Sequence, residues 1–411
     1  MLAVDVFDQT YASLESAPEW NHASAAKNTA IPAVVVSASA YLDTQRVPGG
    51  VQICTQEYLA TLRAAGFAVT TLDYEPDRRL RARLRRVLQP RPYANRLPPD
   101  LEDRIVNAVN EKTAYVFLNQ VDLAPLAENL KKRLGGRAKL VLLSHGLESV
   151  DHLHFLRARG LAGPFQKARP ADLMNLARRL VAECNHRLHL DHVLCLSSFE
   201  AEIERWLGAR QVQWLPRTIS GTPLDWRPKG TFIGYVGTLD HAPNTEGLVL
   251  FLRALEGVRP PCLRVRVIGS PRKAAEQIAN RYPFVDYLGP LTDSELREEA
   301  AGWNGFVHPL FCYARGCSTK LAVALGWQIP VLTTSPGCRG YIWQEGRLAL
   351  GETPEELAAL AVRMLDDETA QKAFHDVQRV VQTSPTLDEV AARVRNALLT
   401  ADPKEALCES S

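Results

Sequence analysis

The chain has 411 residues, of which 46% are hydrophobic and 23% are charged. This composition is ordinary for a globular protein and excludes large-scale disorder, while the length suits two domains of roughly 150–200 residues each. The formal net charge is +2, which gives no global argument for nucleic acid, so we expect no nucleic-acid partner.

Residues 1–30 are predicted to form an irregular N-terminal extension. They carry acids where a secretory signal would be basic, and no stretch of the chain approaches 18 uninterrupted apolar residues. The eight cysteines are scattered without a C-x-x-C pair, so neither a zinc site nor a disulfide framework is expected. These features favour a cytoplasmic protein that could contact a membrane but not span it.

Short β-branched apolar runs follow, separated by segments of helical period. Continuous apolar runs of this length are typical of strands buried on both faces of a parallel sheet. The runs lie at 33–39, 68–74, 114–119, 139–145, 192–198 and 211–216. They predict a Rossmann-like domain over residues 31–218.

The stretch RTISGTPLDWRPKG (217–230) interrupts this rhythm with Pro, Gly and Ser and is predicted to be a linker. A second series of apolar runs follows at 231–237, 263–270, 285–289, 305–310, 329–334 and 347–350. It predicts a second Rossmann-like domain over 219–385, and then a C-terminal helix and tail over 386–411. The fold class is therefore α/β, with two doubly wound parallel-sheet domains facing a cleft and with ligands at the carboxyl ends of the strands.

Residues 308–340 contain the richest pattern after any predicted strand. A loop centred on Gly316 precedes a helix that we expect to start near Ser318. Glycine permits close backbone approach, and a helix N-terminus presents free N–H groups with a partial positive charge. Arg315 and Lys320 flank this turn and could clamp a diphosphate. The alternative is a tight strand–helix turn with two solvated bases.

Three further strand ends carry weaker candidates. Gly237 and Thr238 end the first strand of the second domain and would face the same cleft as Gly316. The glycine turn that contains Gly49 and Gly50 follows the first strand of the chain, and it suits either a sugar or phosphate contact or a mere helix start. His145 ends the fourth strand, where it could donate to a sugar hydroxyl or be a structural histidine.

Two other patterns stand apart from the strand ends. His186, His189 and His192 recur at threes but lack acidic companions, so no metal site is predicted. The arginine-rich run Arg78–Arg86 is predicted to lie on an amphipathic helix that has Leu80, Leu84 and Val87 on one face. The arginines of this helix could simply face solvent, contact anionic lipid, or bind an anionic acceptor.

From residue 232 to about 345 the chain resembles the C-terminal domain of retaining GT-B glycosyltransferases of the bacterial mannosyl-, rhamnosyl- and glucosyltransferase-like group (glycosyl transferases group 1). The resemblance rests on strings in the same order and spacing as in that group. They are FIGYVGTLDHAPN, VIG (267–269), VDYLG (285–289), HPL (308–310), GCSTK (316–320), PVLTT (330–334) and GCRG (337–340). The N-terminal half resembles the group more loosely, through PGGVQ, AAGFAVTTLDY (64–74) and DHVLCLSSFEAEI.

The resemblance implies metal-independent, retaining transfer of a hexosyl or deoxyhexosyl group, with no cofactor, from a nucleoside-diphosphate sugar. The N-terminal domain would hold a glycan, lipid-linked or small-molecule acceptor, as in polysaccharide or glycoconjugate biosynthesis. The residues implied at the donor are Gly237, Thr238, Tyr287, Leu288, Gly316, Cys317, Ser318, Thr319 and Lys320, with His145 beside the sugar.

One departure from the group is chemical. Arg315 and Val323 stand where the group commonly has two glutamates, one on the sugar and one on the ribose. Neither side chain can accept a hydroxyl hydrogen bond as a carboxylate does. Two alternatives therefore remain open: a non-catalytic GT-B scaffold or partner subunit, and another GT-B enzyme such as a sugar-nucleotide epimerase. An inverting enzyme would need a base, for which Asp43, His145 and Glu148 are unranked candidates.

Overall fold

The computed structural model describes residues 30–43, 49–77, 93, 96–156, 169–313 and 315–399. Contacts within the chain separate Met1–Ala30 from a second compact unit, Ile31–Ser411. All of the helices and strands named below belong to the second unit. The predicted basic helix over Arg78–Arg86 lies outside the described residues.

The first half of this unit forms a six-stranded parallel sheet in the order β2-β1-β3-β4-β5-β6. Strand β1 pairs with β2 over its whole length and with β3 from Ala33 to Val36, so Val35 lies opposite both Thr71 and Phe117. Its elements are β1 (Ile31–Ala38), α2 (Ser39–Leu42), α3 (Gly50–Ala64), β2 (Phe67–Tyr74), α5 (Leu101–Ala108), β3 (Tyr115–Asn119), the 3-10 helix η2 (Val121–Leu126), α6 (Ala127–Leu134), β4 (Lys139–Leu143), α7 (Glu148–Leu156), α8 (Pro170–Arg187), β5 (His192–Cys195), α9 (Ser198–Trp206) and β6 (Val212–Trp214).

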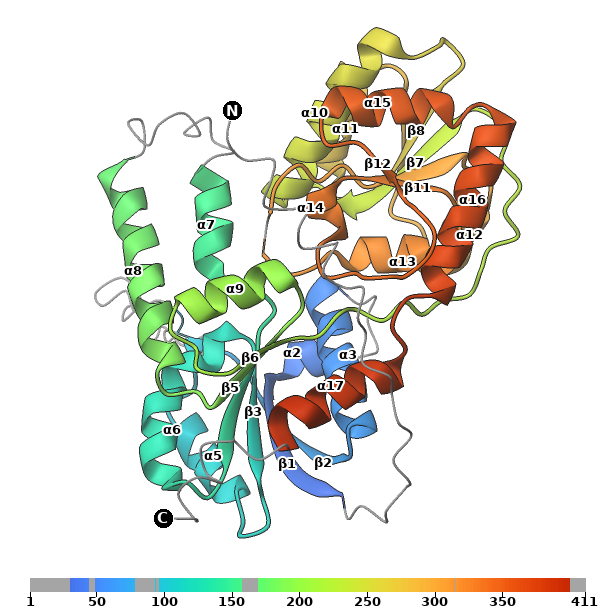
Figure 1. Cartoon of the computed structure of the whole chain (residues 1–411). Helices are drawn as coiled ribbons and strands as arrows, with labels where there is room; N and C mark the ends of the chain where they lie inside the picture. Colours follow the sequence, from blue (N-terminus) through green and yellow to red (C-terminus); the bar gives the residue numbers. More distant parts are fainter. Residues whose placement is uncertain are drawn as a thin grey trace. The chain divides into compact units, whose positions relative to one another are not determined.

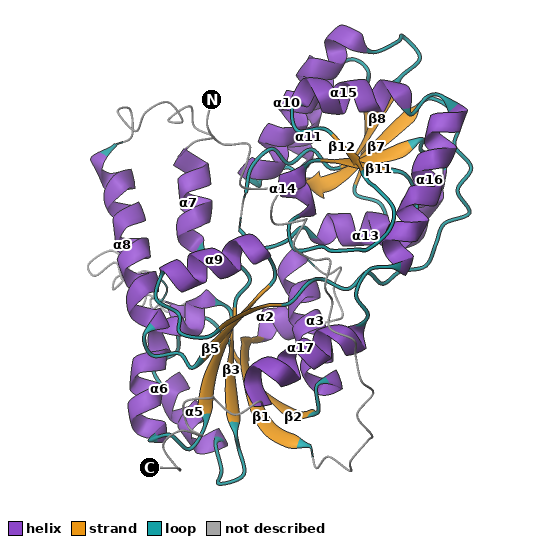
Figure 2. Cartoon of the chain, viewed as in Figure 1, coloured by secondary structure: helices purple, strands orange, loops and turns teal. Residues whose placement is uncertain are grey.

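The second half forms another six-stranded parallel sheet, in the order β12-β11-β10-β7-β8-β9. Figure 2 shows its strands in orange among purple helices. Its elements are β7 (Phe232–Thr238), α10 (Ala242–Val258), β8 (Arg264–Ser270), α11 (Arg272–Arg281), β9 (Val285–Gly289), α12 (Asp293–Ala301), β10 (Gly305–Val307), α13 (Thr319–Trp327), β11 (Val331–Thr333), α14 (Ser335–Cys338), β12 (Ala349–Leu350), α15 (Pro354–Arg363), α16 (Asp367–Gln382) and α17 (Leu387–Leu399).

Each of the predicted apolar runs overlaps a strand, so the predicted α/β class with two doubly wound sheets is confirmed. The alternation of apolar runs with amphipathic segments was enough to predict this class, because a parallel sheet has helices on both faces. The predicted linker over 217–230 contains neither helix nor strand. The strand order of each sheet reverses at one point, between β1 and β3 in the first and between β7 and β10 in the second.

Apolar clusters cover both faces of each sheet. On the first sheet, α5 and α6 pack on one face with Ile105 and Leu130, and α3 packs on the other with Leu62. On the second sheet, α10, α11 and α15 share one cluster, whereas α13 and α16 share the other. Burial of this apolar surface makes the main stabilising contribution in such layers.

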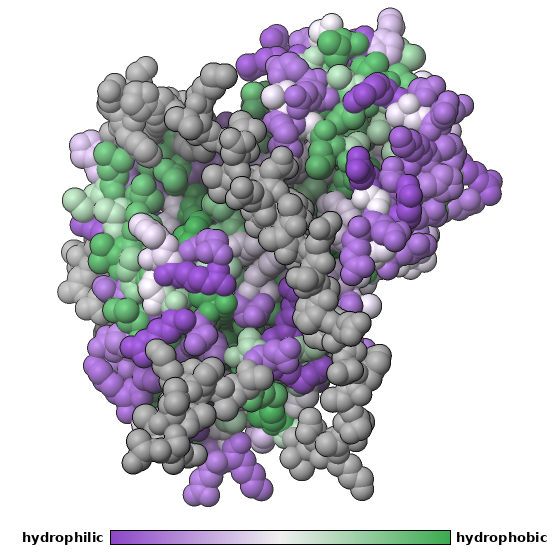
Figure 3. Space-filling view, in the orientation of Figure 1, coloured by the Kyte–Doolittle hydropathy of each residue, from purple (hydrophilic) through white to green (hydrophobic). Residues whose placement is uncertain are grey.

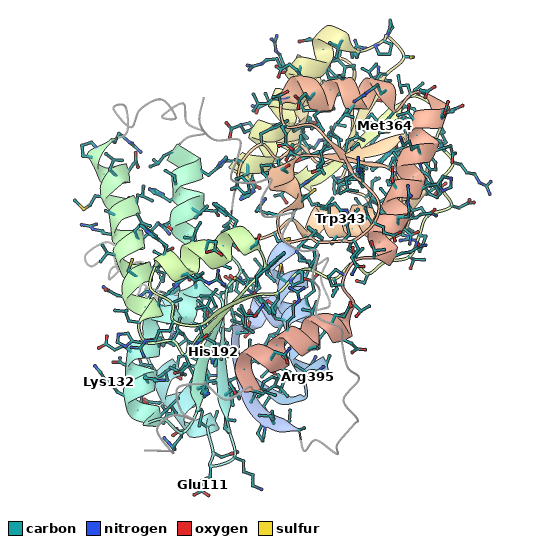
Figure 4. The ribbon with its side chains drawn as sticks, in the orientation of Figure 1. Glu111, Lys132, His192, Trp343, Met364 and Arg395 are labelled. Carbon is teal, nitrogen blue, oxygen red and sulfur yellow. The ribbon has the colours of Figure 1, made fainter. Side chains whose placement is uncertain are left out.

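The last helix, α17, packs on the first sheet and not on the second. Val390 and Val394 of α17 belong to the cluster that contains α3 and β1, and Figure 1 shows α17 in red beside α3 in blue. Arg395, labelled in Figure 4, donates a hydrogen bond of 3.0 Å from Nη1 to the carbonyl oxygen of Ala64. The chain therefore crosses between the sheets twice, once in the linker and once between α16 and α17.

Helix α8 buries charged side chains and exposes apolar ones. Arg187 is fully buried and pairs with Glu204 of α9, with 2.6 Å between Nε and Oε2. Met174 and Val181 are 53% and 60% exposed, and Leu188, directly after the helix, is 55% exposed. The apolar surface over α8 is green in Figure 3. Within the described part of the chain, no helix combines the length and the apolar character needed to cross a bilayer.

Candidate functional site

A cavity of about 430 Å³ opens at the carboxyl ends of the strands, at the switch point between β7 and β10. Ligands of doubly wound sheets bind at this position. The residues that line it come from both sheets' domains and are Gly50, Val51, Cys54, His145, Thr238, Asp240, His241, Pro243, Asn244, His308, Leu310, Arg315, Gly316, Cys317, Ser318, Thr319, Lys320 and Arg339. We call it the switch-point cavity. It brings together most of the residues that the sequence singled out.

Two helix N-termini meet at the switch-point cavity. Helix α3 begins at Gly50 and α13 begins at Thr319, and a Cβ on Gly50 would lie 3.3 Å from Thr319 Oγ1. Neither helix has a capping hydrogen bond from its N-cap side chain or an acidic residue in its first turn. Free N–H groups and the positive ends of two helix dipoles therefore point to one place, which favours an anion.

Lys320 adds a positive charge in the first turn of α13. Among the described residues, no carboxylate lies within ion-pair distance of its ammonium group. Burial lowers the pKa of Lys320 to about 8. A cation at a helix N-terminus is electrostatically unfavourable, so this lysine is understandable if an anion binds beside it. Gly237 lies beside it, because a Cβ there would lie 3.0 Å from Lys320 Nζ and 2.6 Å from the Tyr235 hydroxyl oxygen.

The N-cap of α13, Ser318, bonds to a histidine instead of to its own helix. Its hydroxyl lies 2.8 Å from His308 Nε2, while His308 Nδ1 lies 3.1 Å from Thr333 Oγ1. Thr333 donates its own proton to the His308 carbonyl, so the imidazole donates from Nδ1 and accepts at Nε2. Burial lowers the pKa of His308 to about 3. Because the Ser318 hydroxyl bonds to this neutral histidine, it does not cap α13. The N–H groups at the start of α13 therefore remain available for a ligand.

Gly316 has a carboxylate partner already. Its backbone N–H donates to Glu200 Oε1 of α9 at 2.6 Å, so this donor is not free for a phosphate. Burial raises the pKa of Glu200 to about 7, although the Gly316 N–H and Arg339 oppose the rise. Both chain segments here need glycine: Gly316 has φ +67°, and a Cβ on Gly146 (φ +112°) would lie 2.4 Å from the Gly316 nitrogen.

Arg315 lines the cavity but is also ion-paired. Its guanidinium forms ion pairs with two acids of α7. It contacts Glu148 Oε1, and its Nε lies 3.0 Å from Asp151 Oδ2. The side chain is 33% exposed. Its predicted contact with a donor phosphate stays a prediction, and the two acids of α7 reduce the positive charge that Arg315 offers. Lys320 is therefore the stronger candidate for neutralising an anion.

Arg339, which the sequence analysis did not single out, holds the loop from Arg315 to Lys320 in place. Its Nε donates to the Gly316 carbonyl at 2.7 Å, and Nη2 donates to the Arg315 carbonyl at 3.1 Å. Nη1 donates to the Pro336 carbonyl at 2.7 Å. The residue is only 8% exposed. Its position in the string GCRG gave no chemical signal, because its partners are backbone carbonyls.

His145 is oriented by an amide at the end of the neighbouring strand. Asn119 Nδ2 donates to the hydroxyls of Ser37 and Thr55, which leaves Asn119 Oδ1 to accept from His145 Nε2 at 2.7 Å. The tautomer follows from this network. His145 Nδ1 is buried without a hydrogen-bond partner, and burial lowers the pKa of the imidazole to about 3. The group that remains for a ligand is an acceptor, not the donor that we expected.

The other predicted residues divide into two sets. Thr238, Cys317, Ser318 and Thr319 line the cavity, and Gly49 is the N-cap of α3. Tyr287 and Leu288 lie on the edge strand β9 and do not line it; the Tyr287 hydroxyl donates to the Gly269 carbonyl at 3.0 Å. Within the described ranges, no group of three or more His, Cys, Asp or Glu side chains could hold a metal ion.

Two doubly wound sheets with a cationic cavity at their switch point define a GT-B architecture. Residues 230–367 match the model of the family Glycosyl transferases group 1. The matched segment contains the second sheet up to α15, including Lys320 and Arg339. Fold and family match together support a GT-B glycosyltransferase.

Solved structures similar to this chain agree on the fold. Sucrose-phosphate synthase from Thermosynechococcus elongatus has a TM-score of 0.64 and 17% identity, over 92% of this chain and 100% of that one. HepE of Anabaena, in complex with UDP and glucose, has a TM-score of 0.57 and 13% identity, over 90% and 99%. The apo lipopolysaccharide outer core galactosyltransferase WaaB has 0.56 and 14%, over 90% and 99%. No curated protein matches the chain by sequence.

Proposed function

We propose that this protein transfers a hexosyl or deoxyhexosyl group from a nucleoside-diphosphate sugar to a hydroxyl group of an acceptor. The observation that carries the proposal is the meeting of two uncapped helix N-termini with Lys320 at the switch-point cavity. A diphosphate is the anion that suits this site, because its oxygens accept from several N–H donors while the ammonium neutralises its charge.

In the proposed reaction the bond between the anomeric carbon and the phosphate oxygen breaks, and its electron pair stays on the departing diphosphate. Lys320 and the N–H groups of α3 and α13 stabilise the developing charge, and groups preorganised in this way usually lower an enzymatic barrier more than any other single effect. The chain thus supplies its own positive charge, which supports metal-independent transfer. Cys317, Ser318 and Thr319 provide the backbone that surrounds the diphosphate, with Gly237 and Thr238 beside it.

We propose retention of configuration at the anomeric carbon. An inverting enzyme needs a general base for the acceptor hydroxyl, and Asp240 is the only carboxylate among the described residues that line the cavity. His145 is a weak base, because burial lowers its pKa to about 3. The acceptor proton would instead pass to the departing diphosphate oxygen as the new glycosidic bond forms. His145 Nδ1 would accept a hydrogen bond from a sugar hydroxyl.

The acceptor class and the cellular location are also proposals. We assign acceptor binding to the first sheet's domain over 31–218, and donor binding to 219–385. The solved neighbour HepE contains UDP and glucose, which supports a uridine donor as the first to test. A glycan, lipid-linked or small-molecule acceptor, and a cytoplasmic protein with peripheral membrane contact through Arg78–Arg86, are proposals that rest on the sequence.

A non-catalytic GT-B subunit is the second candidate, and a specific observation favours it. The Gly316 N–H and the Arg315 guanidinium, both beside the proposed diphosphate, already have carboxylate partners in Glu200, Glu148 and Asp151. In a protein that no longer transfers sugar, these carboxylates could stay bonded to the Gly316 N–H and to Arg315 permanently.

Calorimetry with UDP, GDP, ADP and dTDP separates the two candidates. We expect one nucleotide to bind with micromolar affinity, and Lys320→Ala to weaken that binding at least tenfold. Lys372→Ala, an exposed lysine on α16, is the matched control and should bind as the wild type does. If none of the four nucleotides binds to the folded wild-type protein, the transferase proposal is wrong and the subunit is favoured.

A further inference from the structure

A second cavity, of about 550 Å³, lies on the opposite face of α3 from the switch-point cavity. Gly50, Val51 and Cys54 of α3 face the switch-point cavity. The residues of α3 that line the second cavity are Gln52, Ile53, Gln56, Glu57 and Ala60. One helix is therefore a shared wall between two ligand-sized spaces.

The other walls are Asp43, at the end of α2, and the two crossings of the chain between the sheets. Thr218, Ile219 and Ser220 belong to the linker from β6 to β7, and Pro385, Thr386 and Leu387 lead from α16 into α17. We call this space the hinge cavity. A molecule that fills it would contact both connections between the two domains.

The chemistry of the hinge cavity differs from that of the switch-point cavity. Among the described residues that line it there is no Lys, Arg or His, whereas Lys320, Arg315 and Arg339 line the other cavity. Without a cation, the hinge cavity does not suit a phosphorylated ligand, because the desolvated charge would find no partner.

The groups that do line the hinge cavity suit a neutral, hydroxyl-rich molecule. The carboxyl groups of Asp43 and Glu57 and the amide oxygens of Gln52 and Gln56 can each accept from hydroxyl groups. The amides also donate, although one N–H of Gln52 already bonds to the Ala40 carbonyl at 3.2 Å. Thr218 and Ser220 add hydroxyls, whereas the Thr386 hydroxyl already donates to Glu389 Oε2 at 3.0 Å and accepts from the Glu389 N–H. The apolar faces that a sugar ring needs are those of Ile53, Ile219 and Leu387. A mostly apolar lining with a few convergent polar groups is typical of small-molecule sites of this volume.

We propose that the hinge cavity is a second binding site, and that it takes a phosphate-free mono- or disaccharide. This inference goes beyond the proposed transfer reaction and does not depend on it.

A chain of contacts links the hinge cavity to the loop from Arg315 to Lys320. Glu57 is ion-paired with Nη2 of Arg217, which is fully buried at the start of the linker. Arg217 Nη1 lies 3.4 Å from the Cys317 carbonyl, and its backbone N–H donates to the Gly340 carbonyl at 2.9 Å. A sugar hydroxyl that bonds to Glu57 therefore acts on a residue that holds the switch-point loop. Binding at the two cavities is expected to be coupled, and such coupling is reciprocal.

Saturation-transfer NMR and calorimetry with glucose and maltose test the site on the full chain. Ala60→Trp fills the cavity, and Gln56→Leu removes its amide with little change of volume, so one variant remains informative if the other fails to fold. Gln371→Leu on the exposed surface of α16 is the matched control. Lys320→Ala shows in which cavity the sugar binds, because Lys320 lines the switch-point cavity and not the hinge cavity.

We expect maltose to bind wild type, Gln371→Leu and Lys320→Ala alike, and to bind Gln56→Leu or Ala60→Trp at least fivefold more weakly. Glucose 6-phosphate should not displace it. No binding of either sugar at 10 mM (roughly the weak limit for such sites), or loss of binding in Lys320→Ala alone, would overturn the proposal. Saturating maltose should also change the UDP affinity at least threefold, and an unchanged affinity would disprove the coupling. If UDP binds but neither sugar does, only the hinge-cavity proposal is contradicted. If a sugar binds but no nucleotide does, only the transferase proposal is contradicted.

Discussion

Glu200 Oε1 lies 2.6 Å from the backbone nitrogen of Gly316 and accepts its hydrogen bond, across 116 positions of sequence. The carboxylate belongs to α9 beside the first sheet, and the glycine belongs to the loop that precedes α13 beside the second. The Ser197 hydroxyl donates to Glu200 Oε2 at 3.4 Å, and the charges of Arg339 and Glu204 also act on this carboxyl. The position of the loop at the switch-point cavity therefore depends on a buried acid of the other domain.

Stability should depend on pH through Glu200. Burial raises its folded pKa from 4.5 to about 7, so its stabilising contribution is complete below about pH 4.5 and is lost as pH rises through 7. Glu200→Gln keeps an oxygen acceptor for the Gly316 N–H but cannot ionise. The free energy of unfolding of wild type should fall between pH 5 and 8 relative to the variant, by at most about 3 kcal/mol.

Denaturant unfolding at pH 5, 6, 7 and 8 measures this difference. Glu202→Gln, an exposed acid of the same helix, is the control and should keep the wild-type dependence on pH. Equal pH slopes for wild type and Glu200→Gln would mean that Glu200 titrates normally.

Lys320→Ala should lower the rate of sugar transfer roughly 10²-fold or more while the fold persists, as expected for loss of one preorganised charge. Burial lowers the pKa of Lys320 to about 8, so kcat/KM of the wild type should fall as pH rises through 8. Lys320→Arg should move this limb to higher pH, because guanidinium stays charged. A variant Lys320→Ala within twofold of wild type would contradict the proposed role.

Arg315→Glu should abolish activity with the native donor and also lower stability. The substitution would gather three carboxylates, because Glu148 and Asp151 already face this position. Arg179 Nη1 still lies 3.3 Å from Glu148 Oε2, so the loss of the guanidinium falls mainly on Asp151. The charge exchange Arg315→Glu with Glu148→Arg should recover part of the lost melting temperature. If the double variant melts no higher than Arg315→Glu, the ion pair contributes nothing measurable.

His145 should remain neutral throughout pH 5–8, since burial, helped by Arg315 and Arg217, lowers its pKa to about 3. NMR of the imidazole nitrogens measures this directly, with the proton expected on Nε2. Asn119→Asp replaces the amide oxygen that accepts from Nε2 with a carboxylate, which should raise the pKa of His145 by favouring the charged form. A wild-type imidazole that titrates near pH 6.5 would exclude the assigned network.

Many residues of the switch-point cavity were predictable from local sequence, because residues that follow the strands of a parallel sheet lie at one edge of it. Strands were recognisable as apolar runs, and the carboxyl ends of parallel strands meet at one edge. Thr238, His145, Lys320 and Gly50 could therefore be expected near one another, and the structure has all four in one cavity. Tyr287 and Leu288, which the family resemblance implied near the nucleotide base, lie on the edge strand β9 and do not line this cavity, and their role stays a prediction.

The sequence by itself determined the two sheets, the glycine turns and the lysine in the first turn of α13, because these depend on periodicity and on neighbours along the chain. Only the tertiary structure decided that Glu200 occupies the Gly316 N–H, that Arg339 binds carbonyls of the same loop, and that α17 returns to the first sheet. Such contacts join residues far apart in the chain. Their partners are backbone groups or single side chains, which leave no periodic pattern, so only the packing of helices and strands determines them.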